Sequence, residues 1–281
     1  MKTFLDCIPC FVNQALRVGR IATDNEADIK LLLDRIGSKI KDIPMDHTPP
    51  EMGVIIYDEI RKITGIDDPY KTTKQENIAE ALSLYPELSD LVRRSDNPLF
   101  TAIRIAIAGN VIDLGMDKAF NLVDDVKTIL QQDFAICDLE AFEQKLETAR
   151  SVVYLGDNAG ESVFDKILIE NLRKPVIYVV RGIPIINDVT EEDAIASGLD
   201  KVAEIISSGT PAPATILHLC NDAFLKRFYA ADMIISKGQG NYEGLSETDR
   251  PVFFLLKAKC PIIARDLGVN EDDIVLKYSL K

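Results

Sequence analysis

The sequence predicts an α/β protein in which a Rossmann-like, mainly parallel sheet is covered by helices and preceded by an all-helical N-terminal region. Residues 1–148 place apolar side chains at helical spacing and contain almost no alternating runs. From residue 149 onward, short β-branched runs alternate with helical patterns, and strict alternation of this kind indicates a parallel sheet. We therefore expect two regions, a helical one at 1–148 and an α/β domain at 149–281.

Several segments of the first region have the apolar spacing of amphipathic helices. They cover residues 10–22, 25–40, 50–65, 74–95, 99–115 and 116–132. Pieces containing Pro and Gly at 41–50 and 65–71 interrupt the pattern and predict turns. The first half is therefore expected to be an array of helices.

Short runs of the second region are apolar without alternation, which predicts strands that are buried on both faces. They cover residues 151–156, 175–181, 201–208, 232–238 and 251–258. Helical patterns fill intervals at 160–174, 190–199 and 214–231, and Thr190 is a residue type favoured at an N-cap. Parallel strands of this kind would all end at one edge of the sheet.

Composition argues against several classes of partner. With 32 basic and 45 acidic residues the net charge is −13, which opposes binding to the phosphate backbone of nucleic acids. No segment approaches the roughly 20 apolar residues of a membrane-spanning helix, and the N-terminus lacks the apolar region of a signal peptide. We expect a cytoplasmic protein without a nucleic-acid or membrane partner, and the pattern predicts no oligomeric state. Five cysteines, an odd number, indicate reduced thiols or a metal site.

Polar side chains follow four of the predicted strands. They are Asp157 and Asn158 after the first, Asp188 after the second, Ser207 and Ser208 after the third, and Lys237 after the fourth. Because ligands bind at the carboxyl ends of the strands in open parallel sheets, we expect these groups to form one site. Any single cluster could instead supply turn formers or helix caps, and this alternative stays open.

Part of this set has the chemistry of a metal site. Asp157, Asn158 and Asp188 offer oxygen ligands, which suit a hard or borderline divalent cation such as Mg²⁺ or Mn²⁺. Their pattern therefore predicts a divalent metal ion at the edge of the sheet.

The other side chains suit a phosphate. Lys237 supplies a positive charge, and Ser207 and Ser208 supply hydrogen bonds. Gly160 would let the backbone at a helix start approach an anion, while Glu161 beside it could line the site or simply cap that helix. The α/β domain is therefore expected to bind both metal and phosphate.

Three motifs and a cysteine pair carry a resemblance to a known family. They are "GDNAGE" at 156–161, "IPIINDVT" at 183–190, "SKGQGNYEGL" at 236–245 and "CIPC" at 7–10. With these motifs in this arrangement, the sequence resembles the DUF89 family of metal-dependent damage-control phosphatases. It is most similar to the archaeal and bacterial branch with an N-terminal Cys-x-x-Cys, and the resemblance spans nearly the whole chain.

The resemblance implies hydrolysis of phosphate monoesters, with sugar phosphates and phosphorylated cofactor intermediates as candidate substrates. It implies that Asp157, Asn158 and Asp188 bind the metal ion, which would be Mn²⁺, Co²⁺, Ni²⁺ or Mg²⁺, and that Lys237 holds the substrate phosphate. Asp157, Asp188 and Lys237 are therefore the expected catalytic residues. The attack could come from water or from a carboxylate such as Asp157 or Asp188, and the sequence leaves both open.

Two weaker signals lie in the helical region. Asn110 and Asp113 share one face of an otherwise apolar helix. They either make buried hydrogen bonds to a neighbouring helix or, as the resemblance suggests, form part of the substrate-binding wall. Cys7 and Cys10 are either small packing residues of the first helix or, again by resemblance, ligands of an accessory metal site.

The only two histidines are assigned structural roles. His47 lies in a Pro-rich turn, where it could face the substrate but is expected to be solvated. His218 falls within the predicted helix at 214–231 and is expected to pack in the interior. Catalysis would therefore depend on metal and carboxylate groups.

Two other functions compete with the phosphatase. The run "VVYLGDNAGE" at 152–161 superficially resembles the first loop of S-adenosylmethionine-dependent methyltransferases, but the usual three spaced glycines are missing. A non-catalytic module that binds a metal and a phosphorylated metabolite would use the same ligands as the enzyme. Binding of S-adenosylmethionine without metal would favour the first alternative.

Overall fold

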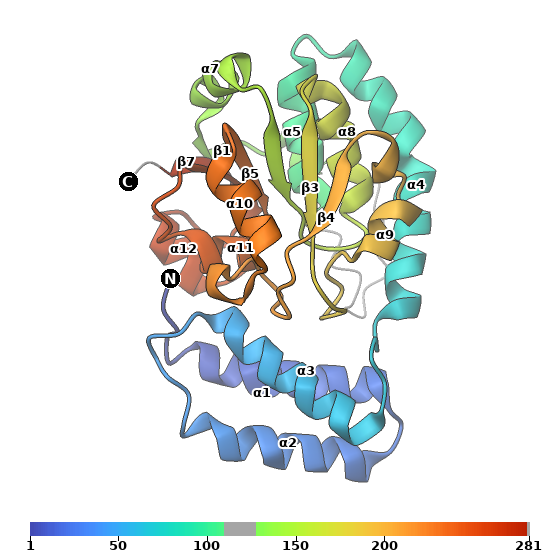
Figure 1. Ribbon diagram of the computed structural model, residues 1–281, viewed down its shortest axis with the longest axis vertical. Helices are drawn as coiled ribbons and strands as arrows, with labels where there is room; N and C mark the ends of the chain where they lie inside the picture. The colour runs from blue at the N-terminus through green and yellow to red at the C-terminus, as the bar shows by residue number, and fades with distance from the viewer. Residues whose placement is uncertain (110–127, 280–281) are drawn as a thin grey trace.

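The computed structural model describes residues 1–109 and 128–279 (Figure 1). Two of the residues considered above, Asn110 and Asp113, lie outside the described residues. Within the described part, no helix is long and apolar enough to span a membrane.

The described residues form one sheet with the strand order β1-β7-β6-β5-β2-β3-β4. The strands are β1 (Phe134–Cys137), β2 (Val152–Leu155), β3 (Val176–Val180), β4 (Glu204–Ser207), β5 (Met233–Lys237), β6 (Val252–Lys257) and β7 (Ile274–Ser279). Neighbouring strands run parallel except for β6 and β7, which are antiparallel. The predicted Rossmann-like, mainly parallel sheet is therefore confirmed, with β1 and β7 as strands that were not predicted.

Helices surround this sheet. They are α1 (Cys7–Ala22), α2 (Glu26–Ile40), α3 (Pro49–Thr64), α4 (Lys71–Arg94), α5 (Pro98–Gly109), α7 (Leu139–Thr148), α8 (Ser162–Leu172), α9 (Glu191–Ala196), α10 (Asp222–Ala230), α11 (Gly238–Leu245) and α12 (Pro261–Leu267), with short 3₁₀ turns η1 (Leu199–Lys201) and η2 (Leu217–Leu219). Thr190 is the N-cap of α9, as predicted, and its backbone N–H donates to Asp193.

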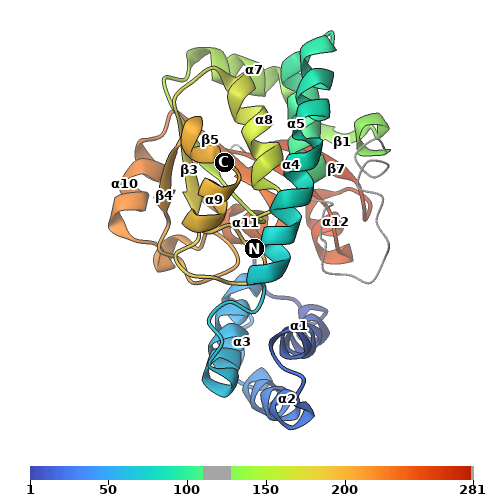
Figure 2. The same ribbon diagram turned by 90° about the vertical axis from the view of Figure 1, so that its right-hand side faces the viewer.

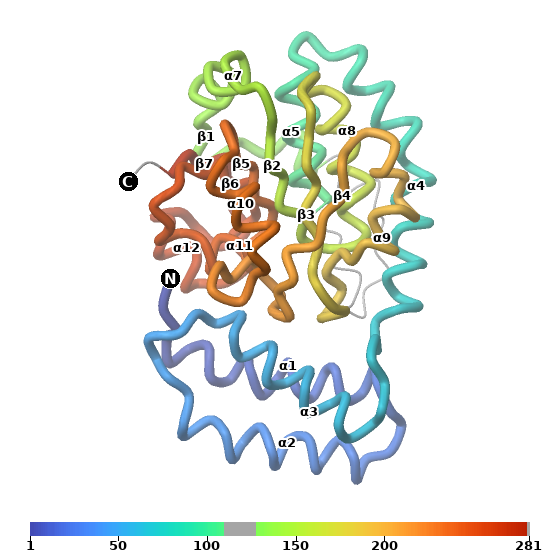
Figure 3. Tube along the Cα trace, viewed as in Figure 1, coloured from blue at the N-terminus to red at the C-terminus, as the bar shows by residue number. Residues whose placement is uncertain are grey.

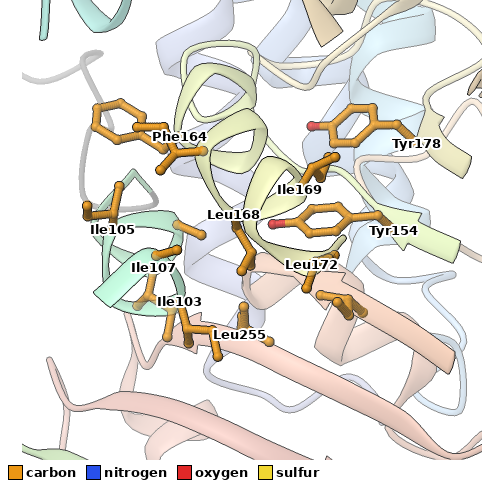
Figure 4. Packing of buried hydrophobic residues seen from close by; sticks show 14 of the residues in the cluster. Ile103, Ile105, Ile107, Tyr154, Phe164, Leu168, Ile169, Leu172, Tyr178 and Leu255 are labelled. Atoms are coloured by element: carbon orange, nitrogen blue, oxygen red, sulfur yellow. The ribbon is translucent and has the colours of Figure 1, made fainter. Parts of the chain in front are cut away.

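Each face of the sheet has its own hydrophobic core, because successive strand residues point to opposite faces. Tyr154 of β2 packs with α4, α5 and α8, whereas its neighbour Val153 packs with α10, α11 and α12. Figure 4 shows Ile103 and Ile107 of α5 close to α8 on the first face. Burial on both faces explains why β2, β3 and most of β5 and β6 read as apolar runs.

Helices α1, α2 and α3 form a separate layer, which we call the helical cap (Figures 1 and 3). Their core includes Ile185, which comes from the loop after β3. Arg61 of α3 also donates a hydrogen bond to the carbonyl oxygen of Pro184 in that loop. The cap therefore lies over the edge of the sheet at which β3 ends.

Helix α4 runs from the cap along the side of the α/β unit, as Figure 2 shows. Together with α5 it packs against α8 and so belongs to the first face of the sheet. Residues 1–148 are not entirely helical, because they include β1 at the edge of the sheet. The division of the chain at residue 148 stays a prediction.

The predicted helix at 214–231 is wrong in its first half. The chain forms η2 there, and α10 begins only after Asn221, whose side chain accepts from the backbone N–H of Phe224. His218 is therefore not a packing residue. Its side chain is 66% exposed and lies 3.2 Å from Glu51 of α3.

Candidate metal and phosphate site

The candidate site lies where the sheet changes direction. From β2 the chain passes through α8 to β3 on one side, whereas from β5 it passes through α11 to β6 on the other. Strands β2 and β5 are neighbours, so their carboxyl ends flank a topological switch point, the usual ligand site of open α/β sheets. Asp157 follows β2, and Lys237 ends β5.

The loop after β3 folds back to bring Asp188 beside Asp157 and Asn158. Val189 N–H donates to the Asp157 carbonyl at 2.8 Å, and Ala159 N–H donates to the Asn187 carbonyl at 2.8 Å. Asn158 and Asp188 consequently pair as an isolated antiparallel bridge. The structure thus brings together the three residues that the sequence nominated as metal ligands.

Two unusual backbone conformations hold these loops. Gly238, at φ 77°, passes so close to Asp157 that an added Cβ would lie 1.8 Å from its Oδ2. Ile186 has φ 47°, a conformation that costs energy for a β-branched residue. The first feature explains why residue 238 must be glycine, and the second places local strain two residues before Asp188.

Lys237 lies in a complete buried network. Its Nζ donates to Glu161 at 3.0 Å and to Asp165 at 2.7 Å, and all three side chains have no exposed surface. Asp165 also accepts hydrogen bonds from Tyr154 at 2.7 Å and Tyr178 at 2.8 Å. Burial lowers the pKa of Lys237, but the two carboxylates outweigh it, so the pKa is raised and the ammonium is firmly charged.

Glu161 connects this network to the predicted metal ligands. It accepts a hydrogen bond from Asn158 Nδ2 at 2.6 Å. This bond fixes the amide so that Asn158 Oδ1 remains available as an oxygen ligand. Glu161 therefore orients a predicted metal ligand, and its contact with the phosphate stays a prediction.

Arg181 follows β3 and contacts the other two predicted ligands. Its Nε donates to Asp188 Oδ2 at 2.6 Å, and its Nη2 lies 3.6 Å from Asp157 Oδ1. The hydrogen bond from Arg181 leaves the second oxygen of Asp188 for a cation. Arg181 thus aligns the carboxylate of Asp188.

The electrostatics of the cluster favour an added cation. Burial raises the pKa of Asp157 well above its usual range, and the charges of Glu161 and Asp188 raise it further. Burial also raises the pKa of Asp188 to about 6, although Arg181 opposes the rise. Buried carboxylates that repel one another are stabilised by a divalent ion, and their oxygens are the ligands that such ions prefer.

The donor set therefore fits a divalent metal ion. It contains two carboxylates and one amide, a combination suited to Mg²⁺ or Mn²⁺. A cluster of three or more His, Cys, Asp or Glu side chains with metal-binding geometry is not found in residues 1–109 and 128–279. A metal bound here would complete its shell with water or substrate oxygens.

The remaining predicted phosphate ligands have mixed surroundings. Ser208 is fully buried, and its hydroxyl donates to the carbonyl of Val180, so it is engaged in the fold. Ser207 lines a cavity of about 320 Å³ together with Arg181 and Gly182. An added Cβ at Gly160 would lie 3.0 Å from Asn77 of α4, so this glycine permits close helix packing.

Cys7 and Cys10 lie in the first turn of α1. Burial raises the pKa of both thiols, and the nearby Cys260 and Glu243 raise it further. Cys10 is exposed, and Cys7 is partly buried. The accessory metal site stays a prediction that the geometry of the described residues does not support.

Three residues near the site were not nominated from the sequence. Asp165 lies on α8 and anchors Lys237. Lys259 follows β6 and is partly exposed, and burial raises the pKa of Asp157 and Glu161 while the charge of Lys259 opposes that rise. Tyr57, from α3 of the cap, lies near enough to Asp188 for that charge to contribute to its raised pKa. Only Lys259 had a usable signal, because it stands just after a predicted strand.

Comparisons with known proteins identify the class. The model of the damage-control phosphatase ARMT1-like domain matches residues 3–275. A protein named damage-control phosphatase from Pyrococcus horikoshii is 36% identical over 286 residues, covering 98% of this chain and 97% of its own length. Another of that name from Archaeoglobus fulgidus is 33% identical over 295 residues, covering 99% of each chain.

A solved structure agrees with these matches. The crystal structure of a DUF89 family protein from Pyrococcus horikoshii superposes with a TM-score of 0.87 at 33% identity and covers 98% of each chain. This chain therefore belongs to the damage-control phosphatase ARMT1-like family, and the resemblance to DUF89 is confirmed. The names of its relatives support a role as a damage-control phosphatase.

Proposed function

We propose that this protein is a metal-dependent phosphatase that hydrolyses phosphate monoesters of small metabolites, such as sugar phosphates or phosphorylated cofactor intermediates. The observation that carries the proposal is the meeting of Asp157, Asn158 and Asp188 at the switch point of the sheet. The proposed cofactor is Mn²⁺, Co²⁺, Ni²⁺ or Mg²⁺.

In the proposed reaction, the protein holds and orients the groups that would bind the metal ion. Glu161 fixes the amide of Asn158, and Arg181 fixes the carboxylate of Asp188, so the ligand oxygens point in set directions. A bound divalent ion would supply Lewis-acid polarisation of the phosphoryl group and activation of a water molecule. A carboxylate, Asp157 or Asp188, remains the alternative nucleophile.

Two lysines near the strand ends could supply positive charge for the phosphate. Lys237 donates two of its ammonium hydrogens to Glu161 and Asp165, which leaves one hydrogen for a substrate. Its contact with the phosphate stays a prediction. Lys259 is partly exposed and its charge acts on Asp157, so it would attract an anionic substrate into the site.

The experiment is phosphate release from a panel of sugar and cofactor phosphates. The protein is first treated with a chelator, and Mg²⁺, Mn²⁺, Co²⁺ or Ni²⁺ is then restored separately. We expect release that requires metal and disappears in Asp157→Ala. Folded protein that releases no phosphate with any metal would contradict the proposal, favour the binding module, and make titration with S-adenosylmethionine the next measurement.

A further inference from the structure

Arg181 carries hydrogen-bond donors that nothing in the described residues satisfies. The residue is only 2% exposed, and its Nε is bonded to Asp188. Its terminal nitrogens Nη1 and Nη2 are buried and make no hydrogen bond to residues 1–109 or 128–279. The contact of Nη2 with Asp157 is 3.6 Å, an ion pair too long for a hydrogen bond.

Unsatisfied donors on a buried cation require an explanation. Each unsatisfied buried donor costs on the order of 1–3 kcal/mol, and more where the group is charged. Folded proteins rarely keep such groups, and exceptions concentrate where a ligand supplies the missing acceptor. The contrast with Lys237, whose nitrogen contacts two carboxylates in the same sheet edge, shows that burial here does not prevent pairing.

The position of these donors indicates which kind of ligand they would bind. Arg181 contacts two of the three predicted metal ligands, so its guanidinium lies beside the place where a metal ion would bind. The planar guanidinium matches two oxygens of a phosphoryl group, and it matches them better than a lysine does.

We propose that Arg181 binds the phosphoryl group of the substrate, donating from Nη1 and Nη2 to its non-bridging oxygens. This inference deepens the proposed function and rests on it. Arg181 thus has two neighbouring partners, the carboxylate of Asp188 through Nε and the substrate through the other end of the guanidinium.

Charge favours binding of the metal ion before the phosphate. The buried cluster contains four carboxylates, from Asp157, Glu161, Asp165 and Asp188, and two cations, Arg181 and Lys237, so its formal charge is −2. A phosphate dianion would be repelled by this cluster, whereas a divalent cation would neutralise it. We therefore expect phosphate to bind to Arg181 more tightly once a divalent ion is held by the carboxylates.

The test separates phosphate binding from metal binding. Calorimetry would measure the affinity of wild type, Arg181→Gln and Arg181→Lys for Mn²⁺, and then the affinity of each metal-loaded protein for inorganic phosphate. We expect phosphate to bind about 10- to 100-fold more weakly to Arg181→Gln, as for loss of charge-assisted hydrogen bonds. Arg181→Lys should lose less, because it keeps the charge without the planar fork.

Metal affinity should change less than phosphate affinity. Arg181→Gln removes a positive charge beside two carboxylates, which favours Mn²⁺, and also removes the donor that aligns Asp188, which opposes it, so its Mn²⁺ affinity should stay within about threefold of wild type. A purely structural arginine would instead weaken both affinities together. The control is Arg104→Lys, an arginine of α5 that bonds backbone carbonyls near residue 130, and it should alter neither affinity.

Several outcomes would overturn the inference: phosphate affinity within twofold of wild type in Arg181→Gln, loss of metal binding together with phosphate binding, or metal-loaded wild type that binds no phosphate. If wild type binds phosphate through Arg181 but hydrolyses nothing, the inference stands and the phosphatase proposal fails. If wild type is active and Arg181→Gln binds phosphate normally, only the inference fails.

A structure of the wild type with Mn²⁺ and orthovanadate keeps the test valid should the variants not fold. We expect an Arg181 terminal nitrogen within about 3.2 Å of a vanadate oxygen. Bound vanadate with both nitrogens beyond hydrogen-bond distance would contradict the inference.

Discussion

Two buried cations lie at the carboxyl ends of β3 and β5, on either side of β2, and the fold gives them different partners. Lys237 contacts Glu161 and Asp165, and two tyrosine hydroxyls complete the surroundings of Asp165. Arg181 contacts Asp157 and Asp188, yet two of its nitrogens have no hydrogen-bond partner among the described residues. A complete network stabilises one conformation, whereas an incomplete one is suited to binding a ligand.

The difference follows from where the residues stand in the chain. The Lys237 network is built from regular elements, with Tyr154 on β2, Tyr178 on β3 and Asp165 on α8. The Arg181 network is built from the loops after β2 and β3, which include the strained Ile186. Regular elements supply a rigid base, and the loops at their ends carry the groups that bind.

The largest expected effect comes from removing a predicted ligand in the Arg181 network. Asp188→Asn should lower metal-dependent phosphate release at least a thousandfold, roughly 4 kcal/mol, because the charged ligand is lost. The metal-free variant should be at least as stable as wild type. Burial makes the charged form of Asp188 unfavourable, as its raised pKa indicates, and asparagine carries no charge.

Phosphate release and thermal unfolding without metal would measure both effects. The matched control is Asp200→Asn, a change at an exposed position of η1, which should alter neither. Activity of Asp188→Asn within threefold of wild type would remove Asp188 from the site.

The next effect comes from breaking the complete network. Lys237→Met leaves Glu161 and Asp165 buried without their cation and should destabilise the protein by about 3–5 kcal/mol. Urea denaturation of the metal-free protein would measure the free energy of unfolding. Lys257→Met, which removes a more exposed pair with Asp272, should cost less than about 1 kcal/mol. Equal losses in the two variants would refute the distinction between the networks.

The sequence predicted the parts of this protein that depend on local patterns of residues. Strands such as β2 and β3 are apolar throughout because both faces are covered. Asp157, Asn158 and Asp188 could be nominated because the carboxyl ends of parallel strands meet at one edge. The edge strand β1 was missed because it has four residues and buries only alternate side chains in part.

The missed parts depend on packing between distant segments. Asp165 is one carboxylate in an amphipathic helix, and only the docking of α8 on the sheet turns it toward Lys237. His218 was expected inside because its neighbours are apolar, but the chain at that point forms a 3₁₀ turn, and the side chain lies beside Glu51 of the cap. Periodicity within one segment could not reveal either contact.

A smaller effect should follow from trimming one bond of the complete network. Tyr178→Phe removes a hydrogen bond of 2.8 Å to buried Asp165 and should cost about 1.5–3 kcal/mol. Metal affinity should not change, because the remaining partners still hold Asp165. Tyr85→Phe is the control, since it removes a hydroxyl that bonds Glu170 at the surface, and it should cost under about 0.5 kcal/mol. A loss of metal binding in Tyr178→Phe would show that the two networks are not independent.

The smallest expected effect is the pH dependence that Asp188 of the incomplete network contributes. Burial raises the pKa of Asp188 from 3.8 to about 6, and Glu161 adds to this rise. Protons therefore compete with the metal, whose affinity should be about tenfold weaker at pH 5 than at pH 7.

The stability of the metal-free protein should change with pH in the opposite direction to metal affinity, so it should fall as pH rises. Asp188 keeps its proton up to about pH 6 in the native state, whereas the unfolded state releases it at lower pH. The stabilisation that this proton gives the native state is therefore complete below the unfolded pKa and is lost as pH rises through about 6. Calorimetry at pH 5, 6 and 7 would give metal affinities, and Asp188→Asn would remove this residue's share of the dependence. Arg181→Gln should move the midpoint of this pH dependence to higher pH, because the arginine lowers the pKa of Asp188. A midpoint that stays in place would mean that Arg181 contributes little to the electrostatics of the metal ligands.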